Sequence, residues 1–308
     1  MERRSFIKKG ATAVAGLGVG ISSLNAMDVQ PREANFKNQF QLKYAPHLGM
    51  FKELSSKDPI DQLHYMADQG FTAFEDNGMK GRTVELQEKM AQVMAARKIE
   101  MGVFVAHKIY WDKPTLTSGK QDAREEFLGQ IKESVEVAKR VNAKWMTVVP
   151  GYVDLRQDIG FQTANVVESL KQASAILEKE NIIMVLEPLN FFNHPGLFLN
   201  KIPQAFQVCK AVDSPSCKIL FDIYHQQIQE GNIIPNIDLA WDEVAYFQIG
   251  DNPGRNEPTT GEINYKNIFK HIHSKGYKGI LGMEHGNSQT GKEGELAVIE
   301  AYRSSDSF

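Results

Sequence analysis

The sequence predicts a single (β/α)8 TIM barrel that occupies residues 40–308. Eight short apolar segments alternate with longer amphipathic segments, and no break in composition divides them into separate domains. The segment 182–186, Ile-Ile-Met-Val-Leu, is apolar at every position, which is typical of a strand covered on both faces. A doubly wound sheet is the alternative, but it usually carries a glycine-rich phosphate loop after an early strand, and this sequence has none.

The predicted elements follow one another in strand-then-helix order. The helices are recognised by apolar residues that recur with a period near 3.6, and Asp58-Pro59 begins the first of them with a capping residue and a favourable Pro. The predicted strands are 42–48, 73–75, 101–107, 145–150, 182–188, 218–224, 244–249 and 279–284. The predicted helices are 59–69, 84–97, 123–141, 163–180, 203–211, 265–275 and 294–302, with a weaker one at 233–239.

Residues 1–26 are predicted to be a twin-arginine export signal. Residues 3–9 read Arg-Arg-Ser-Phe-Ile-Lys-Lys, the usual order of such a signal, and a weakly apolar run follows at 11–24. That run is short for a membrane span and ends in residues suited to cleavage; a basic, disordered terminus is the alternative. We expect recognition by the twin-arginine export machinery, a spacer at 27–39 and a periplasmic or extracellular protein, with the signal either removed or kept as an anchor.

Composition and charge exclude several classes of function. The chain is 42% hydrophobic and 24% charged, as in ordinary globular proteins. Its net charge is -3, without a basic stripe, so we expect no nucleic-acid partner. Cys209 and Cys217 are too few for a disulfide framework or a zinc-thiolate site. A single disulfide between them is one interpretation, and two buried thiols are the favoured one.

Ionisable or amide side chains end nearly every predicted strand. Active sites of (β/α)8 barrels lie at the carboxyl ends of the strands, so polar residues there indicate a site. One such ending would be an ordinary solvated strand end, whereas the recurrence of this ending around the barrel favours a functional site. The residues concerned are His47, Glu75, His107, Glu187, Asp222 with His225, Gln248 with Asp251, and Glu284 with His285.

The last four strand ends predict a metal site. Glu187, Asp222 and Glu284 each follow an apolar run directly, and a buried carboxylate without a partner is very costly. No Lys or Arg ends these strands, whereas a divalent cation would bind several carboxylates at once. The amide oxygen of Gln248 completes an all-oxygen set, which suits Mg²⁺ or Mn²⁺ better than Zn²⁺.

Four motifs resemble those of hydroxypyruvate isomerases. They are Glu-Pro-Leu-Asn at 187–190, Asp-Ile-Tyr-His at 222–225, Gln-Ile-x-Asp-Asn-Pro-Gly-Arg-x-Glu-Pro at 248–258, and Thr-Gly-Glu-Ile-Asn-Tyr at 260–265. That family belongs to the xylose isomerase-like barrel superfamily, which also contains ketose 3-epimerases. The resemblance spans about residues 40 to 303, and the long polar loop 248–265 is its most specific part.

The resemblance implies a site and a reaction. One divalent metal ion would be held by Glu187, Asp222, Gln248 and Glu284, and Glu187 and Glu284 would also be the proton-transfer pair. A proton would move next to a carbonyl through an enediolate, converting hydroxypyruvate to 2-hydroxy-3-oxopropanoate or isomerising a related sugar. Gln248 is similar to the isomerase branch, since the superfamily commonly has His there. A homo-oligomer is also implied.

His225 and Arg255 are predicted to contact the small-molecule substrate. His225 resembles a substrate-oxygen contact of the epimerase branch, and the alternative is a hydrogen bond that supports the site from behind. Arg255 has the planar fork that suits a substrate carboxylate. Alternatively, Arg255 holds its own loop in place by pairing with Glu257 or Glu262, which we interpret as loop-ordering residues.

Three further strand-end residues are predicted to bind substrate: His47, His107 and Glu75. Their surroundings in the first half of the chain depart from the cytosolic hydroxypyruvate isomerases, which leaves the substrate open. Trp111 and Tyr110, after His107, are expected either to stack on a sugar ring or to pack at the surface.

Three other functions remain as alternatives. An exported enzyme has little use for an intracellular metabolite, so a ketose 3-epimerase or an isomerase of a free periplasmic sugar is the first. A non-catalytic carbohydrate-binding protein is the second, although Glu187 and Glu284 argue against it because binding alone needs no proton-transfer pair. A metal-dependent endonuclease is the third; eight His in total and a net charge of -3 argue against its multi-zinc site and basic face.

Overall fold

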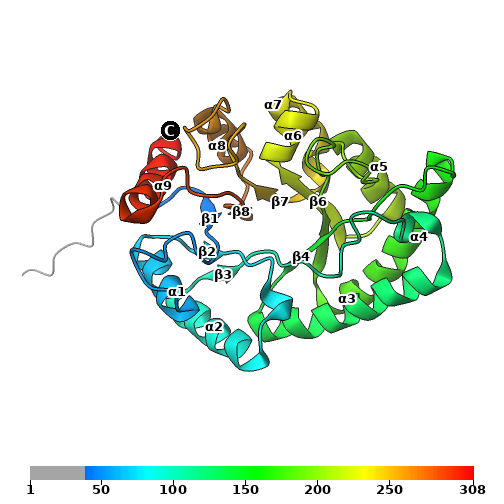
Figure 1. Ribbon diagram of the computed structural model, residues 1–308, viewed down its shortest axis with the longest axis horizontal. Helices are drawn as coiled ribbons and strands as arrows, with labels where there is room; N and C mark the ends of the chain where they lie inside the picture. Colours follow the sequence, from blue (N-terminus) through cyan, green and yellow to red (C-terminus); the bar gives the residue numbers. More distant parts are fainter. Residues whose placement is uncertain (1–38) are drawn as a thin grey trace, which may run out of the picture. The chain divides into compact units, whose positions relative to one another are not determined.

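The computed structural model describes residues 39–308, and within them helices form a ring around a central set of parallel strands (Figure 1). The predicted export signal and the predicted spacer through residue 38 lie outside the described residues. The strands are β1 (Lys43–Ala45), β2 (Ala73–Phe74), β3 (Glu100–Met101), β4 (Trp145–Val148), β5 (Ile183–Leu186), β6 (Cys217–Asp222), β7 (Val244–Gln248) and β8 (Ile280–Gly282).

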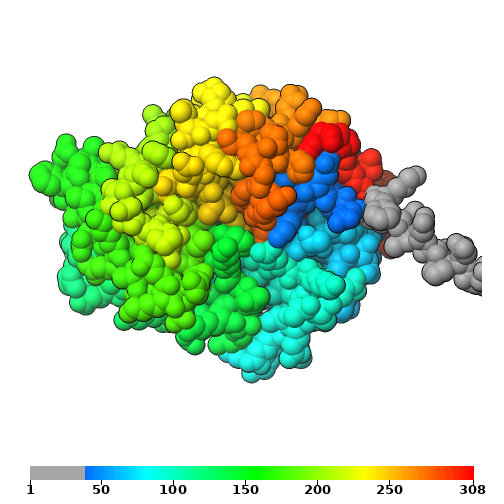
Figure 2. All heavy atoms as spheres, turned by 180° about the vertical axis from the view of Figure 1, so that it is seen from behind, coloured from blue at the N-terminus to red at the C-terminus, as the bar shows by residue number. Residues whose placement is uncertain are grey.

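The strands close into a barrel. Six of them pair in the order β1-β8-β7-β6-β5-β4, and β2 pairs with β3. Single bridges from His47 to Glu75 and from Val105 to Thr147 join these two sets. Figure 2 shows the start of the described chain, in blue, against the last helix, in red, as the pairing of β1 with β8 requires. The predicted (β/α)8 barrel is confirmed.

The helices lie close to their predicted positions. Asp58 begins the first as predicted, because its Oδ1 accepts the Ile60 N–H at 2.7 Å. No helix within residues 39–308 is long and apolar enough to cross a membrane. The helices are α1 (Pro59–Asp68), α2 (Val84–Arg97), α3 (Gln121–Val141), α4 (Ile159–Leu177), α5 (Ile202–Val212), α6 (Ile223–Gln229), α7 (Ile233–Ala240), α8 (Tyr265–Ser274) and α9 (Gly291–Ser305).

The interior of the barrel is a packed core. Each strand, or the extended segment that continues it, contributes one buried side chain to this cluster, as expected for the layered filling of such barrels. Small residues on β1 and β2 leave room for a Trp and a Tyr on β4 and β7. The cluster consists of Ala45, Ala73, Val103, Trp145, Val185, Leu220, Tyr246 and Ile280. Polar side chains at the carboxyl ends of the strands therefore stand on a rigid apolar floor.

One boundary differs from the prediction in a way that matters for the site. The strand expected at 218–224 ends at Asp222, and helix α6 begins at Ile223. Asp222 causes the change, because its Oδ1 accepts the backbone N–H of His225 at 3.1 Å and so caps the helix. The apolar pattern 219–221 continues through Ile223, which is why the sequence suggested a longer strand.

The two cysteines are free thiols. Cys209 on α5 and Cys217 on β6 are both buried. A hydrogen bond to Cys217, together with burial, raises the pKa of the Cys209 thiol well above its usual value. The Cys209 thiol therefore stays protonated at neutral pH, and the two free, buried thiols agree with the favoured interpretation.

Candidate active site at the carboxyl ends of the strands

Three carboxylates meet above the core. Glu187 follows β5, Asp222 ends β6 and Glu284 lies two residues beyond β8. The apolar strands beneath bury two of them, with relative exposures of 7% for Glu187 and 1% for Asp222, while the Glu284 side chain is 25% exposed. Arg255 joins two of the three, because its Nη2 donates to Asp222 Oδ2 at 3.3 Å and to Glu284 Oε2 at 2.7 Å. The predicted convergence of Glu187, Asp222 and Glu284 is present.

His225 lies beside these carboxylates. Its Nε2 is 4.0 Å from Glu187 Oε1 and 3.6 Å from Asp222 Oδ2. Potential ligand atoms of Glu187, Asp222 and His225 all lie within 4.8 Å of one another, close enough to hold one metal ion. His225 was predicted to contact the substrate. Its proximity to the two carboxylates would also allow it to be a metal ligand.

The hydrogen bonds of His225 decide between these roles. Its Nδ1 accepts the backbone N–H of Asn190 at 3.3 Å and lies 2.6 Å from the Asn190 side-chain nitrogen. Burial lowers the pKa of His225 to about 4, so the ring is neutral. A neutral ring that accepts at Nδ1 carries its proton on Nε2, and that buried atom has no partner within the described residues. His225 thus directs a donor, not a lone pair, at the site.

The charges of the site are unbalanced. Burial, followed by the charges of Glu284 and Asp222, raises the pKa of Glu187 well above its usual value. Burial raises the pKa of Glu284 to about 7, even though Arg255 opposes the shift. The buried Glu75 adds a fourth carboxyl group to the site, and one guanidinium cannot neutralise them all. A divalent cation would remove this imbalance.

Gln248 offers the site a free oxygen. Its Nε2 donates to Glu75 Oε1 at 2.9 Å, while its Oε1 is buried and has no partner within residues 39–308. A buried amide oxygen is left unpaired only at a cost, which a cation removes by binding it. The set of Glu187, Asp222, Gln248 and Glu284 therefore fits a cation that prefers oxygen ligands.

Glu75 lines the barrel mouth with both of its oxygens bound by the protein, and its predicted substrate contact stays a prediction. It is 2% exposed, and both of its oxygens accept hydrogen bonds, from Tyr246 Oη at 2.8 Å and from Gln248 Nε2 at 2.9 Å. Burial, with a smaller contribution from Glu284, raises the pKa of Glu75 to about 8. Its polar atoms are turned toward neighbouring side chains of the protein.

His47 lies at the mouth of the barrel. Its Nδ1 is 2.8 Å from the Leu48 carbonyl oxygen, and its Nε2 is 3.0 Å from the His285 carbonyl oxygen. It lines a cavity of about 290 Å³ together with Glu284, Asn77 and other residues. The position next to Glu284 agrees with the predicted substrate contact, which stays a prediction.

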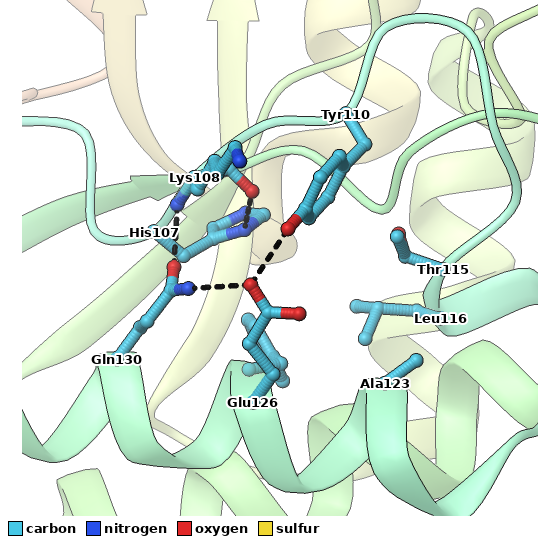
Figure 3. Close-up of a pocket in the computed structure, with 9 residues that line it drawn as sticks. His107, Lys108, Tyr110, Thr115, Leu116, Ala123, Glu126 and Gln130 are labelled. Atoms are coloured by element: carbon cyan, nitrogen blue, oxygen red, sulfur yellow. Dashed lines mark hydrogen bonds between the residues drawn. The ribbon is translucent and has the colours of Figure 1, made fainter.

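His107 has a structural set of partners (Figure 3). Its Nδ1 lies 3.0 Å from the Lys108 carbonyl oxygen, and its Nε2 accepts the Val149 N–H at 3.3 Å. The cavity beside it measures about 10 Å³, room for about one water molecule. Both ring nitrogens of His107 are thus engaged by the backbone, and its predicted substrate contact stays a prediction.

The loop 248–265 is held in place by buried carboxylates. Asp251 accepts the backbone N–H groups of Gly261 at 2.9 Å and Ile263 at 3.0 Å. Glu257, 2% exposed, accepts the N–H of Ser288 at 2.9 Å. These bonds tie the loop to itself and to the segment after β8, so the loop presents a fixed surface to the site. The loop-ordering interpretation of Glu257 agrees with these contacts.

Arg255 is the part of this loop that reaches the site. Its backbone adopts a left-handed conformation with φ of 49°, and its N–H donates to the Asp251 carbonyl at 2.7 Å. The guanidinium carbon lies 5.0 Å from the centre of the Tyr224 ring, a favourable cation–π distance. Its charged group meets the site carboxylates rather than the glutamates of its own loop.

Sequence reasoning missed three residues that support the site. Asn77 Nδ2 donates to Glu284 Oε1 at 2.9 Å, Asn190 binds His225, and Tyr246 binds Glu75. Asn190 lies inside the motif 187–190, and Tyr246 precedes Gln248 by two residues on a strand, hence on the same face. Those signals point to both residues, whereas no local pattern marks Asn77.

Comparison with known proteins places the chain in a family. The model of the xylose isomerase-like TIM barrel family matches residues 63–305. Hydroxypyruvate isomerase of Escherichia coli strain K12 is 35% identical over 183 residues, covering 58% of this chain and 69% of that protein. A 2-oxo-tetronate isomerase of Cupriavidus necator is 29% identical over 177 residues, covering 58% of this chain and 68% of that protein.

Solved structures confirm the fold. An AP endonuclease of family 2 from Brucella melitensis has a TM-score of 0.73 at 22% identity, covering 85% of this chain and 99% of that one. A 3-keto-D-glucoside 4-epimerase from Escherichia coli has a TM-score of 0.72 at 17% identity, with the same 85% and 99% coverage. Barrel, strand-end carboxylates and sequence relatives lead to one conclusion: the chain belongs to the xylose isomerase-like TIM barrel family, as an enzyme of the isomerase kind.

Proposed function

We propose that this protein is a metal-dependent isomerase that moves a proton next to a carbonyl group through an enediolate, in the manner of hydroxypyruvate isomerase. One observation carries the proposal. Three strand-end carboxylates, the buried Glu187 and Asp222 and the partly exposed Glu284, lie at the same end of the barrel as Gln248, whose Oε1 has no partner within residues 39–308. The 35% identity to hydroxypyruvate isomerase supports the same reaction class.

The four residues would hold one divalent cation, Mg²⁺ or Mn²⁺. All four ligand atoms are oxygens, and this donor set matches the preference of those two ions. Bound there, the cation would polarise the substrate carbonyl and stabilise the negative charge that develops on deprotonation. Among relatives of the fold, a protein named IOLI was crystallised with a zinc atom, at 16% identity and a TM-score of 0.65.

The proton would be moved by Glu187 and Glu284. One carboxylate takes the proton from the carbon next to the carbonyl, and the other returns a proton to the neighbouring carbon. Both groups have pKa values raised by burial, which brings a carboxyl group closer to the neutral pH at which it must accept and release a proton. In an epimerase the proton would instead return to the opposite face of the same carbon.

Arg255 and His225 would orient the substrate. The Arg255 guanidinium has the planar geometry that binds a carboxylate with two parallel hydrogen bonds. The unpartnered Nε2–H of His225 is available to a substrate oxygen near Glu187 and Asp222. The cavity of about 290 Å³ next to Glu284 has polar walls and the size of a small sugar or hydroxy-keto acid.

A ketose 3-epimerase or sugar isomerase acting in the periplasm is the second candidate. Its support is the predicted twin-arginine signal, because free sugars are more sensible extracytoplasmic substrates than hydroxypyruvate. The structural likeness to D-psicose 3-epimerase, with a TM-score of 0.68 at 17% identity, shows the shared fold.

Deuterium incorporation followed by NMR tests the proposal. Purified protein with Mn²⁺ or Mg²⁺ in D₂O is offered hydroxypyruvate, a four-carbon oxo-acid, and a panel of aldoses and ketoses. We expect metal-dependent entry of deuterium next to the carbonyl, and the labelled carbon distinguishes isomerase from epimerase.

The control variants isolate the two glutamates. Glu187→Gln and Glu284→Gln should each abolish labelling, while the exposed Glu88→Gln on α2 should not. Labelling that persists in both active-site variants would contradict the assigned proton-transfer pair. Tight sugar binding without any labelling would instead support a non-catalytic carbohydrate-binding protein.

A further inference from the structure

We propose that Glu75 is a positioning residue that fixes the amide orientation of Gln248 and thereby aims the Gln248 oxygen at the metal. The inference rests on the proposed metal site, and it assigns to Glu75 a role other than the substrate contact suggested by its strand-end position. A glutamine ligand has an inherent ambiguity, since rotating its amide by half a turn exchanges an oxygen for a nitrogen that cannot bind a cation.

The hydrogen bonds around Glu75 remove this ambiguity. The backbone N–H of Val103 donates to Tyr246 Oη at 3.4 Å, so the Tyr246 hydroxyl directs its own proton elsewhere. That proton goes to Glu75 Oε2 at 2.8 Å. The remaining oxygen, Oε1, faces the Gln248 amide at 2.9 Å and accepts from its Nε2. When both Glu75 oxygens accept in this way, Gln248 presents its nitrogen to Glu75 and leaves its Oε1 without a partner among residues 39–308.

A backbone amide is the origin of this direction. Hydroxyl and amide groups can rotate, but the Val103 N–H is fixed by the barrel strand. Val103 thus donates to Tyr246, and Tyr246 and Gln248 both donate to Glu75, so each of these groups has one fixed role as donor or acceptor. The unpartnered Oε1 of Gln248 is its free end.

Two glycines make room for these side chains inside the barrel. A Cβ at Gly282 on β8 would overlap Glu75 Oε2 and lie 2.7 Å from Glu75 Cδ. A Cβ at Gly102 would overlap the Tyr246 hydroxyl. Neither glycine has the positive φ that would by itself require glycine, so the space for Glu75 and Tyr246 is the physical reason for both.

Glu75→Gln makes a sharp test because it preserves shape while changing one acceptor into a donor. Tyr246 still donates to position 75, so the new amide turns its oxygen toward Tyr246 and its nitrogen toward Gln248. Gln248 must then turn its own oxygen toward that nitrogen and its own nitrogen toward the carboxylates. We expect Mn²⁺ affinity, measured from free Mn²⁺ by EPR, to fall about 10–100-fold.

Removing the Tyr246 hydroxyl should reverse that loss. In Glu75→Gln/Tyr246→Phe nothing fixes the amide at position 75, so its oxygen can again face Gln248 and the affinity for Mn²⁺ should recover. Tyr246→Phe alone should stay near wild-type affinity, because Glu75 still accepts from Gln248. Glu295→Gln is the matched control: Glu295 is a buried carboxylate that accepts two backbone N–H groups, with no contact to Gln248.

A second background keeps the test decisive if the single variant folds poorly. In Gln248→Glu, position 248 presents only oxygens, and Glu75→Gln then supplies a donor to a carboxylate. In this Gln248→Glu background, Glu75→Gln should leave the Mn²⁺ affinity unchanged or raise it. In the wild-type background, the same substitution should lower the affinity. A general structural defect would lower affinity in both backgrounds.

The outcomes separate this inference from the proposed function. A wild-type protein that binds neither Mn²⁺ nor Mg²⁺ overturns the metal site and this inference together. Wild-type binding with equal affinity in Glu75→Gln overturns the inference alone, and so does a double variant that binds no better than Glu75→Gln.

Discussion

At the scale of single residues, the chemistry of the site depends on which side-chain atoms carry protons. His225 carries its proton on Nε2 because Nδ1 accepts the Asn190 N–H, and burial lowers its pKa to about 4, which keeps the ring neutral. The Gln248 amide is oriented by Glu75 in the same manner. In both cases a group outside the reacting centre determines whether a side chain offers the substrate or metal a donor or an acceptor.

Asn190→Asp should change the tautomer of His225. The substitution places an acceptor 2.6 Å from Nδ1, where the Asn190 side-chain nitrogen now lies, and so draws the ring proton from Nε2 to Nδ1. We expect kcat to fall about 10–100-fold because the donor aimed at the site is lost. Long-range ¹H–¹⁵N spectra of the ring report the tautomer directly. An unchanged tautomer with lowered kcat would show that Asn190 acts in another way.

At the scale of elements, the short strands position the carboxylates and one long loop completes the site. Asp251 and Glu257 hold the loop 248–265 in place without a ligand. Arg255 is therefore already positioned against the Tyr224 ring. A rigid loop avoids an ordering cost when substrate binds.

Glu257→Gln should loosen this loop. Glu257 is 2% exposed and accepts both the N–H and the hydroxyl of Ser288, and a neutral amide can replace those bonds only in part. We expect the free energy of unfolding, measured in urea, to fall by roughly 1–3 kcal/mol. Glu88→Gln, at an exposed carboxylate on α2, is the control, and an equal loss there would argue against a specific role for Glu257.

At the scale of the whole molecule, closing the barrel concentrates charge. Strands from both ends of the chain bring Glu75, Glu187, Asp222 and Glu284 to the same end of the barrel, where Arg255 forms ion pairs with Asp222 and Glu284. Such a site stores unfavourable electrostatic energy that a cation would release. Metal binding and folding stability should therefore be coupled.

Adding Mn²⁺ should raise the melting temperature. At a free concentration 100 times the Kd, binding to the folded state alone stabilises it by about 2.7 kcal/mol. EDTA should reverse the shift, which differential scanning calorimetry would show. Glu187→Gln should lose most of the shift, whereas an equal shift in that variant would place the cation elsewhere.

Acid should destabilise the protein partly through His107. Burial lowers its pKa to about 4 from the usual value of 6.5. Between those values the unfolded chain binds a proton that the folded protein does not, so this stability is present above pH 6.5 and is lost as pH falls toward 4. At about 1.4 kcal/mol per pKa unit, the loss is roughly 3 kcal/mol.

The comparison with His107→Gln isolates that contribution. The stability difference between wild type and variant, from urea unfolding, should shift in favour of the variant as pH falls from 7 to 4. A difference that does not change with pH would mean that His107 is as easily protonated in the folded protein as in the unfolded chain.

The sequence by itself determined the architecture and the positions of the main site residues. Apolar segments in strand-helix alternation predict the barrel because a doubly covered strand must be apolar, and strand ends must then face one side. This reasoning placed Glu187, Asp222, Gln248 and Glu284 at the same end of the barrel. The family resemblance added their roles, which stay predictions.

Only the tertiary structure decided the hydrogen-bond partners of these residues. The partners of a strand-end side chain are atoms distant in sequence, and so the bonds from Val149 to His107 and from Tyr246 to Glu75 could not be predicted from the sequence. Asn77 reaches Glu284 across 207 positions of the chain, a separation that no local pattern encodes. Local periodicity reports burial and direction, whereas donor and acceptor geometry appears only when the barrel closes.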